Sequence, residues 1–498
     1  MLGQVILLLL QTAFLLGAAY GAYSNGPQYA WLFGILFVHS LLDRQFYLKP
    51  NLMDAYLLFT VVFYYTRWVM GWGNQGTTIF KEDAPNWVRV LKDFAWVGFL
   101  LAVGLKAALR LRLDRRTPLW FSVRGRRLMI LAVVYCLLPV LTLLVARGNL
   151  FEVLLYSVRY PLEYVPMIFL LPFVLRGRSS LPHLRFFVPL IIITLLFLTV
   201  EIFSGRPTGM GWGGIYNRYG SIFGSPNDFG VFLMLSITVL LAFMVEGAIA
   251  WSLKTVTFLA LCLCALASTV SLSAVFSMGF SGLGLVFLAK RKLAGLLALV
   301  AFVLMAAGLY FAFSQAGVLR FLTERAGNLS TFRDSSAYEH YVGVIDGLKE
   351  VSRFTPEEFL TGTLGSRTEL VAPETYYLRI IYLRGIPALL VLLSIIVVSI
   401  AEAYRRYRGA PGSPKQRGLF LAIMVCLCSF SFASLFIPYF DTFPSNFYFW
   451  FLVGILWSEP DATLLPKTST APPGQGSKAR SDLLELKKPS SLSSSVRL

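Results

Sequence analysis

Long apolar runs alternate with short polar loops along the whole of this 498-residue chain. Such runs are typical of membrane-spanning helices, because about 20 apolar residues cross the hydrocarbon core and lipid offers backbone groups no hydrogen-bond partner. The pattern predicts about fourteen helical spans, near residues 4–23, 28–42, 52–72, 88–108, 128–147, 152–175, 186–204, 226–246, 255–271, 273–289, 293–314, 376–402, 418–437 and 446–458.

Basic loops occupy alternate positions in this series of spans. The loops LDRQFYLKPN, KAALRLRLDRRTPLWFSVRGRR, RGRSSLPHLR, AKRK and RRYRGAPGSPKQRG fall on one side, whereas YSNGPQ, RGNLFE and DTFPSN on the other side carry less charge. Lys and Arg accumulate in cytoplasmic loops. The predicted fold is therefore an all-α polytopic bundle over residues 1–458 with both termini in the cytoplasm. The loops 73–87, 205–225 and 315–375 face outward, and 315–375 forms one large helical periplasmic loop.

Composition supports a membrane protein and narrows its chemistry. The chain is 56% hydrophobic and 14% charged, with a formal net charge of +18. In a soluble protein that charge would suggest binding to nucleic acid. Here the basic residues lie in short loops between spans, where they indicate which side of the membrane each loop occupies, so no nucleic-acid partner is expected. The cysteines lie in apolar runs and the histidines are few and scattered, so neither a metal nor another cofactor is predicted. Residues 459–498, rich in Ser, Pro and Lys, predict a disordered cytoplasmic tail.

The stretch NRYGSIFGSPNDFG, residues 217–230, places a polar turn before an apolar span. Ser225 suits a helix N-cap and Pro226 the first helical position, so a helix is predicted to begin here at the outer face. Its free N–H groups and positive dipole end favour an anion, and the guanidinium of Arg218 matches phosphate oxygens. We expect Arg218 and Asn227 to bind a diphosphate. The alternative is an ordinary capped helix beside an interfacial arginine.

A second stretch, SSAYEHYVGVIDGLKEV, predicts an amphipathic helix in the large outer loop. Ser336 and Glu339 form a capping-box pattern at its start. One apolar face, expected to lie across the bundle mouth, carries Tyr338, Tyr341, Ile345, Leu348 and Val351. His340 falls at the border of that face, whereas Glu339 points to water. His340 is therefore a candidate for a site-facing role, against the alternative of a functionless interfacial histidine.

Other ionisable residues lie at or near the predicted outer interface or inside spans. PETYYLRIIYLRGIP carries Glu374, Arg379 and Arg384 at the start of a span. Within YSVRYPLEY, Arg159 and Glu163 are four residues apart and can pair on one helix face. Ionised groups at membrane depth usually face a cavity or a partner. Arg159 is therefore either half of a structural bridge or a second phosphate ligand. Glu201 is a similar, weaker candidate.

These motifs, in order, resemble the O-antigen ligase and Wzy-type polymerase superfamily over about residues 200–400. Arg218 followed by GSIFGSPND and an apolar helix resembles the family signature. FLTGTLGS at 359–366 resembles the turn after the large loop helix, and ETYYLRIIYLRGIPALLVLL resembles the next helix. The chain departs from the pattern at Leu272, where many members have arginine, and at Ala388. Ligases usually have a histidine where Glu374 or Thr375 stands, which favours a polymerase.

The resemblance implies a metal-independent glycosyltransferase in the bacterial inner membrane. Its donor would be a glycan on undecaprenyl diphosphate, its acceptor another lipid-linked repeat unit at the periplasmic face, and its protein partners a chain-length regulator and a flippase. Arg218, Asn227, Arg159 and Arg384 would bind the diphosphate, and His340 or Glu374 would take the acceptor proton. Two alternatives stay open: an O-antigen ligase or related transferase, and a lipid-linked oligosaccharide flippase or transporter, for which inverted repeats would be expected.

Overall fold

The computed structural model divides the chain into two units, Met1–Glu459 and Pro460–Leu498. The second unit, which holds nearly all of the predicted tail, lies outside the described residues. The structure describes residues 2–23, 27–48, 58, 94, 96–105, 123–145, 154, 158–175, 184, 187–203, 209–210, 217–223, 225–292, 294–296, 299–300, 303, 335–363, 375–410, 413–441 and 445–458. These residues are almost entirely helical.

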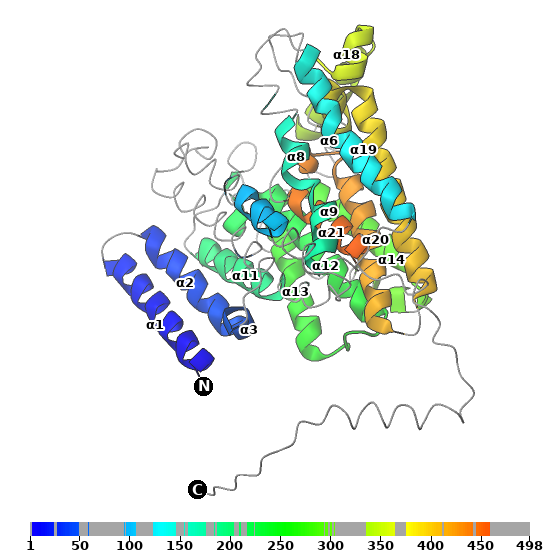
Figure 1. The fold of residues 1–498 in the computed structure, drawn as a ribbon. Coiled ribbons are helices and arrows are strands. Elements are labelled where there is room, and N and C mark those ends of the chain that lie inside the picture. Colours follow the sequence, from blue (N-terminus) through cyan, green and yellow to red (C-terminus); the bar gives the residue numbers. More distant parts are fainter. Residues whose placement is uncertain are drawn as a thin grey trace, which may run out of the picture. The chain divides into compact units, whose positions relative to one another are not determined.

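The first unit begins with an antiparallel pair of helices, α1 (Leu2–Tyr23) and α2 (Pro27–Leu42), followed by the short α3 (Arg44–Leu48) (Figure 1). Along the chain come α6 (Val123–Val145), α8 (Arg159–Tyr164), α9 (Met167–Leu175) and α11 (Phe187–Phe203). The prediction of one continuous helix over 152–175 is wrong, because two separate helices, α8 and α9, lie on either side of Pro166. A proline lacks the N–H that would continue the helical ladder.

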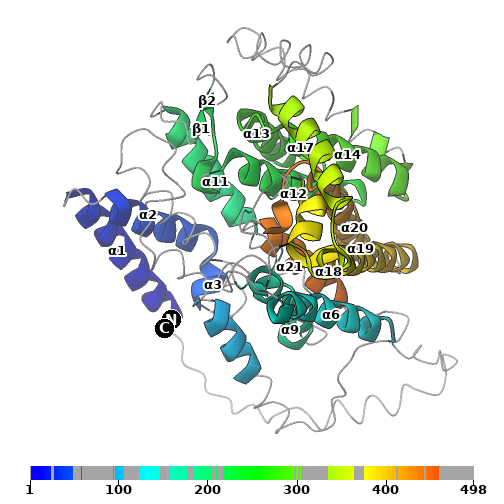
Figure 2. The same cartoon turned by 90° about the horizontal axis from the view of Figure 1, so that it is seen from above.

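The rest of the unit is a bundle around α12 (Pro226–Val245). Around it are α13 (Leu253–Ser268), α14 (Leu272–Leu288), α19 (Tyr376–Gly409), α20 (Pro414–Ala433) and α21 (Ser445–Ser458). The large loop contributes α17 (Ser335–Val351) and α18 (Pro356–Thr361), which pack on α19 (Figure 2). The short elements are the antiparallel strands β1 (Gly209–Met210) and β2 (Asn217–Arg218) and the 3₁₀ turns η3 (Ser221–Phe223) and η4 (Tyr439–Asp441).

Within the described residues, five helices are long and apolar enough to cross a membrane: α1, α6, α12, α19 and α20. Several more apolar helices, including α11, α13 and α14, are shorter. The division of 255–289 into two helices is confirmed by α13 and α14. The predicted count of about fourteen spans is not confirmed, and much of 52–72, 88–108 and 293–314 lies outside the described residues. The apolar helices indicate a membrane protein.

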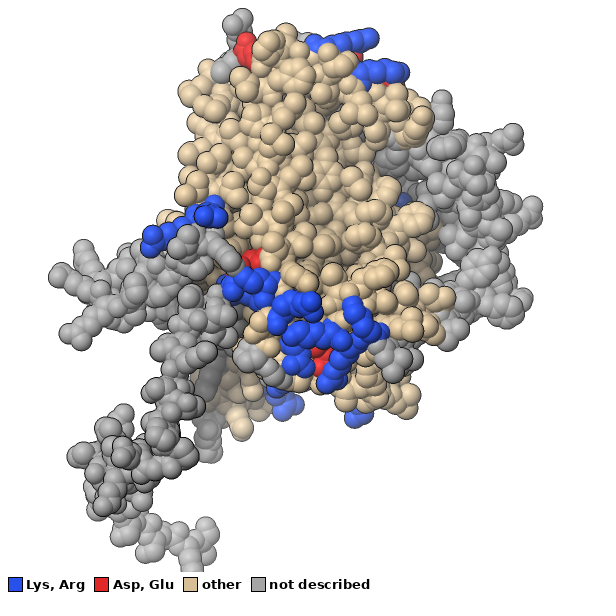
Figure 3. All heavy atoms as spheres, turned by 90° about the vertical axis from the view of Figure 1, so that its right-hand side faces the viewer, with Lys and Arg blue, Asp and Glu red and all other residues tan. Residues whose placement is uncertain are grey.

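The bundle has two ends that differ in charge. At one end α12, α14, α19 and α21 begin; this end, which carries Arg218 and Asp441, is called the site end. At the other end α12, α14 and α19 finish and α20 begins; it is called the basic end. Figure 3 shows Lys and Arg gathered in a band below a broad uncharged surface. The exposed side chains of α14 and α19 include Phe276, Phe280, Phe287, Leu390 and Val397. An apolar surface of this kind is compatible with lipid.

The basic end joins two loops that the charge pattern placed on the same side. Lys290 in AKRK donates through Nζ to the carbonyl of Arg408 (3.1 Å), and its backbone N–H donates to the Tyr407 hydroxyl. Tyr407 also donates to the buried Glu246 (2.6 Å), which accepts from Arg417 Nε (2.9 Å). The relative placement of AKRK and RRYRGAPGSPKQRG is therefore confirmed.

The two glycine motifs of the second half pack directly against each other. Gly362, after α18, and Gly385, inside α19, both have positive φ (81° and 79°). A Cβ on Gly385 would lie 2.4 Å from the Leu360 carbonyl oxygen, and one on Gly362 2.6 Å from the Tyr382 carbonyl oxygen. Thr363 N–H donates to that Tyr382 oxygen (2.7 Å). A side chain fits neither position, so both must be glycine.

Candidate functional site

Helix N-termini converge at the site end. Ser445, at the start of α21, donates to Asp228 in the first turn of α12 (3.0 Å). Ser273, in the first turn of α14, is hydrogen-bonded to Tyr439 of η4 (2.8 Å). In the first turn of α19, Tyr376 stacks on Phe440 of the same η4, with ring centroids 4.8 Å apart. Because unpaired N–H groups and positive dipole ends are brought to one place, this end of the bundle favours negative charge.

Arg218 lies beside the start of α12, half-buried, with its guanidinium fixed from two sides. Its Nη2 donates to Asn227 Oδ1 (2.7 Å), and its Nε donates to the carbonyl oxygen of Thr269 at the end of α13 (3.1 Å). The structure therefore brings together two residues that the sequence assigned to the diphosphate. A guanidinium held in this way is pre-oriented and keeps its charge at any physiological pH.

The helix start after Arg218 forms as predicted. Ser225 is the N-cap of α12, its hydroxyl accepts from the Asp228 N–H (3.4 Å), and Pro226 is in the first turn. Close packing with α14 fixes this end, since a Cβ on Gly230 would lie 2.8 Å from the Ala274 Cβ. Asp228, which is buried, adds a favourable negative charge to the first turn.

The turn between Arg218 and α12 is held by a buried carboxylate. Ser221 has a positive φ of 50°, a conformation that costs free energy for a residue with a side chain. Its N–H donates to Glu201 Oε2 of α11 (2.9 Å), and its hydroxyl donates to the Thr194 carbonyl (2.7 Å). Phe223, two residues on, stacks on Phe229 at 5.6 Å. Glu201 is thus a positioning residue for the turn that carries Arg218.

Tyr439 adds a neutral donor near the same arginine. Burial is the main cause that raises the pKa of its phenol, and the negative charge of Asp228 raises it further. The hydrogen bond to Ser273 and the positive charge of Arg218 act in the opposite direction but are smaller. Tyr439 therefore keeps its proton at physiological pH and can donate a hydrogen bond. Ser271 and Ser273, joined at 3.2 Å between their hydroxyls, extend this polar group along the start of α14.

A second cationic cluster surrounds Asp441. Arg384 of α19 pairs with it at 3.2 Å, and Arg379, one turn earlier, lies 3.5 Å from its other oxygen. Arg384 also donates to the hydroxyls of Tyr135 and Tyr376, at 3.3 Å each. The side chain of Arg384 is 1% exposed and that of Arg379 24% exposed. Arg379 is therefore the more accessible cation of the two, and Arg384 anchors Asp441.

The three residues of η4 connect the two clusters. Tyr439 reaches the serines beside Arg218, and Asp441 reaches the arginines of α19. Between them, Phe440 packs on Tyr376, Phe430 and Phe449. A shift of this turn would therefore change both clusters at once.

The remaining predicted site residues are placed unevenly. Arg159 and Glu163 form the predicted pair, with 3.9 Å between Nε and Oε2, and Tyr164 donates to Glu163 (2.8 Å). His340 belongs to α17, but its side chain and the Ser336–Glu339 capping box lie outside the described side chains. Glu374 lies outside the described residues altogether. The described part of the chain therefore does not show how His340 or Glu374, the two predicted bases, lie relative to Arg218.

The amphipathic loop helix is confirmed, but the face it buries differs from the predicted one. Tyr341 and Leu348 are 52% and 51% exposed. Val351 of the predicted face does pack on the small core of Phe354, Leu378, Ile381 and Tyr382, together with Val344, which was not predicted to lie on that face. Tyr382 donates to the Gly347 carbonyl (3.2 Å). The docked face therefore overlaps the predicted one at Val351 but is turned toward Val344, which leaves Tyr341 and Leu348 exposed.

Sequence reasoning missed the polar residues supplied by loops and distant helices. Asp441 lies in DTFPSN, a loop noted only for its low charge, and Tyr135 lies inside an apolar run. A single acid beside an aromatic-rich span was a usable signal for Asp441. Tyr135, Thr269 and Ser445 carried no such signal, because their roles depend on which helices become neighbours.

Among the residues that the structure describes, no group of three or more His, Cys, Asp or Glu side chains is placed to hold a metal ion. No protein-family model matches this chain, and no curated protein matches it. The family resemblance therefore stays a hypothesis that rests on the quoted motifs.

Proposed function

We propose that this protein is a polysaccharide polymerase of the bacterial inner membrane, with about fourteen spans and its large loop in the periplasm. It would transfer a glycan from undecaprenyl diphosphate to another lipid-linked repeat unit. The observation that carries the proposal is the placement of Arg218, fixed by Asn227 and Thr269 beside the N-terminus of α12. That arrangement suits a leaving group that departs as a diphosphate.

The chemistry follows from the charges. The acceptor hydroxyl attacks the anomeric carbon of the donor, the bond from that carbon to the diphosphate oxygen breaks, and the electron pair leaves with the diphosphate. Arg218 and the helix N-termini would stabilise this developing charge, which is where preorganised donors contribute most. The acceptor proton would pass to His340 or Glu374.

The second arginine cluster has a supporting role in this proposal. Arg384 is occupied by Asp441 and two tyrosines, so it would position η4 and Tyr439. Arg379 and the Arg159 of α8 would be the further cations available to a long diphosphate-linked substrate. A chain-length regulator and a flippase would be the protein partners.

The decisive experiment is a deletion strain whose surface polysaccharide is separated on a gel. A polymerase predicts surface molecules that carry a single repeat unit, restored to long chains by the wild-type gene. Accumulation of free lipid-linked long chains would instead identify a ligase. Loss of surface polysaccharide, with single lipid-linked repeat units trapped on the cytoplasmic face, would identify a flippase.

A further inference from the structure

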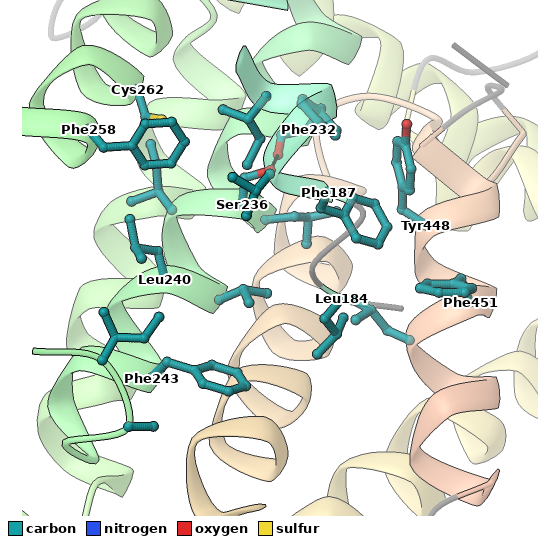
Figure 4. A pocket seen from close by; sticks show the side chains of 18 of the residues that line it. Leu184, Phe187, Phe232, Ser236, Leu240, Phe243, Phe258, Cys262, Tyr448 and Phe451 are labelled. Atoms are coloured by element: carbon teal, nitrogen blue, oxygen red, sulfur yellow. Dashed lines mark hydrogen bonds between the residues drawn. The ribbon is translucent and has the colours of Figure 1, made fainter. Parts of the chain in front are cut away.

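A cavity of about 590 Å³ opens between α11, α12, α13, α20 and α21 (Figure 4). Its size is in the range of small-molecule sites. It is separate from the candidate site, because Arg218, Asp228, Tyr439 and Asp441 are not among its lining residues. The proposed function therefore does not use this cavity.

The cavity is elongated along α12 and apolar. Its lining runs on this helix from Phe232 to Phe243, a rise of about 16 Å, close to half of a hydrocarbon core of about 30 Å. Figure 4 shows aromatic rings from several elements pointing into it. Ser236 lies in the middle, but its hydroxyl donates to the Phe232 carbonyl (2.8 Å) within the helix. The interior therefore suits a hydrocarbon chain that spans one leaflet.

Charge distinguishes the two ends of the cavity. Among the described lining residues, Lys415 is the single formally charged side chain. It lies exposed in the first turn of α20, at the basic end, where Phe243, Ala248 and Ile249 also line the cavity. Toward the site end the lining consists of residues such as Phe232 and Tyr448, with no cation among those described. An amphiphile bound here would therefore place an anionic headgroup at the basic end.

We propose that the cavity binds one acyl chain of an anionic phospholipid from the leaflet at the basic end, with the lipid phosphate at Lys415. The same end carries Lys290, which donates to the Arg408 carbonyl, and Arg291, whose guanidinium lies against Gly247, next to the lining residue Ala248. These cations strengthen the attraction for an anionic headgroup. The lipid fills space between α12, α13 and α20, and thereby stabilises the bundle at the end opposite the Arg218 cluster.

The test measures lipid retention by the purified full-length protein. The protein is incubated with phosphatidylglycerol or with phosphatidylcholine of the same acyl chains, and bound lipid is counted by native mass spectrometry. We expect phosphatidylglycerol to be retained preferentially. Lys415→Ala should lower that preference about fivefold, the effect of one lysine at an anionic surface. Lys254→Ala, an exposed lysine of α13 outside the lining, is the matched control and should leave it unchanged.

A second pair of variants tests the cavity itself. Ser236→Leu fills the space and should reduce retention of both lipids, whereas Ser236→Ala removes the hydroxyl without filling it and should not. Equal retention of the two lipids by the wild type, or equal effects of Lys415→Ala and Lys254→Ala, would overturn the proposal. Displacement of phosphatidylglycerol by a polyprenyl phosphate, equally in wild type and Lys415→Ala, would assign the cavity to an isoprenoid chain instead.

Discussion

Arg384 and Asp441 form an ion pair 3.2 Å long whose side chains are 1% and 3% exposed. The pair ties α19 to η4 and is completed by two tyrosine hydroxyls on the same guanidinium. Because both charges are removed from solvent, each depends on the other for compensation. The loss of one partner therefore costs far more than the loss of an ion pair at the surface.

The first prediction tests that pair. Asp441→Asn should destabilise the protein by about 3–5 kcal/mol, because Arg384 is left as a buried charge without its carboxylate. The measurement is the thermal unfolding midpoint of the purified protein. Glu350→Gln is the matched control, since it breaks the exposed Arg353–Glu350 pair and should change stability by less than about 1 kcal/mol. Similar midpoints for the two variants would show that the buried pair contributes little.

The second prediction concerns Arg218. Arg218→Lys should lower polymer synthesis by about 10²–10³-fold although the charge is kept, because lysine cannot offer the planar fork that Asn227, Thr269 and a phosphate share. The measurement is the chain-length distribution in a complemented deletion strain at matched protein abundance. Arg353→Lys, at an exposed position, should keep full activity. Near-normal chain length with Arg218→Lys would exclude a phosphate clamp at this position.

The third prediction concerns the base. His340→Ala or Glu374→Ala should abolish polymer formation with normal protein levels, whereas Glu339→Ala should not, because Glu339 is predicted to point to water. The assay is the same polysaccharide gel, with abundance checked by immunoblot. If both variants polymerise normally, neither residue is the general base.

The fourth prediction concerns topology. A reporter enzyme fused after Gly365 should be active in the periplasm, and one fused after Pro414 should be active in the cytoplasm. The reason is the cluster of Lys and Arg around AKRK and the start of α20, which should be retained inside the cell. The opposite compartment at either fusion would reverse the assignment of the large loop.

The fifth prediction concerns the interlocked glycines. Gly385→Ala should destabilise the protein by more than about 1–3 kcal/mol, since the cost of a forbidden backbone conformation is added to an overlap with the Leu360 carbonyl. Gly279→Ala, in α14, is the control: the added Cβ would meet no atom within 4 Å beyond the nearby backbone of its own helix. Alanine there should be neutral or stabilising by about 0.5–1 kcal/mol. Equal unfolding midpoints for the two variants would contradict the close backbone contact.

Local patterns predicted local structure well, because their causes are local. The N-cap at Ser225, the separation of α13 from α14 and the Arg159–Glu163 pair all depend on residues within a few positions of each other. The same reasoning failed at Pro166, where the helix is interrupted inside an apolar run, and on the docked face of α17.

The long-range partners could not be predicted for a physical reason. The Thr269 carbonyl is 51 positions from Arg218, and Asp441 is 57 positions from Arg384. Contacts of this kind depend on how helices pack in three dimensions, which the apolar pattern leaves undetermined when a helix is apolar on all sides. The sequence therefore indicated Arg218 and its near neighbour Asn227, but not the distant Thr269 carbonyl that also holds the guanidinium.

The contact between Gly362 and Gly385 has a consequence for how the large loop can evolve. The loop is joined to the bundle there by main-chain atoms, and by the Thr142 hydroxyl, which donates to the Thr361 carbonyl (2.8 Å). Side chains of the loop are constrained mainly where Val344, Val351 and Phe354 pack on α19. The loop positions away from these contacts are therefore free to vary in sequence, while the two glycines that anchor the loop to α19 are constrained.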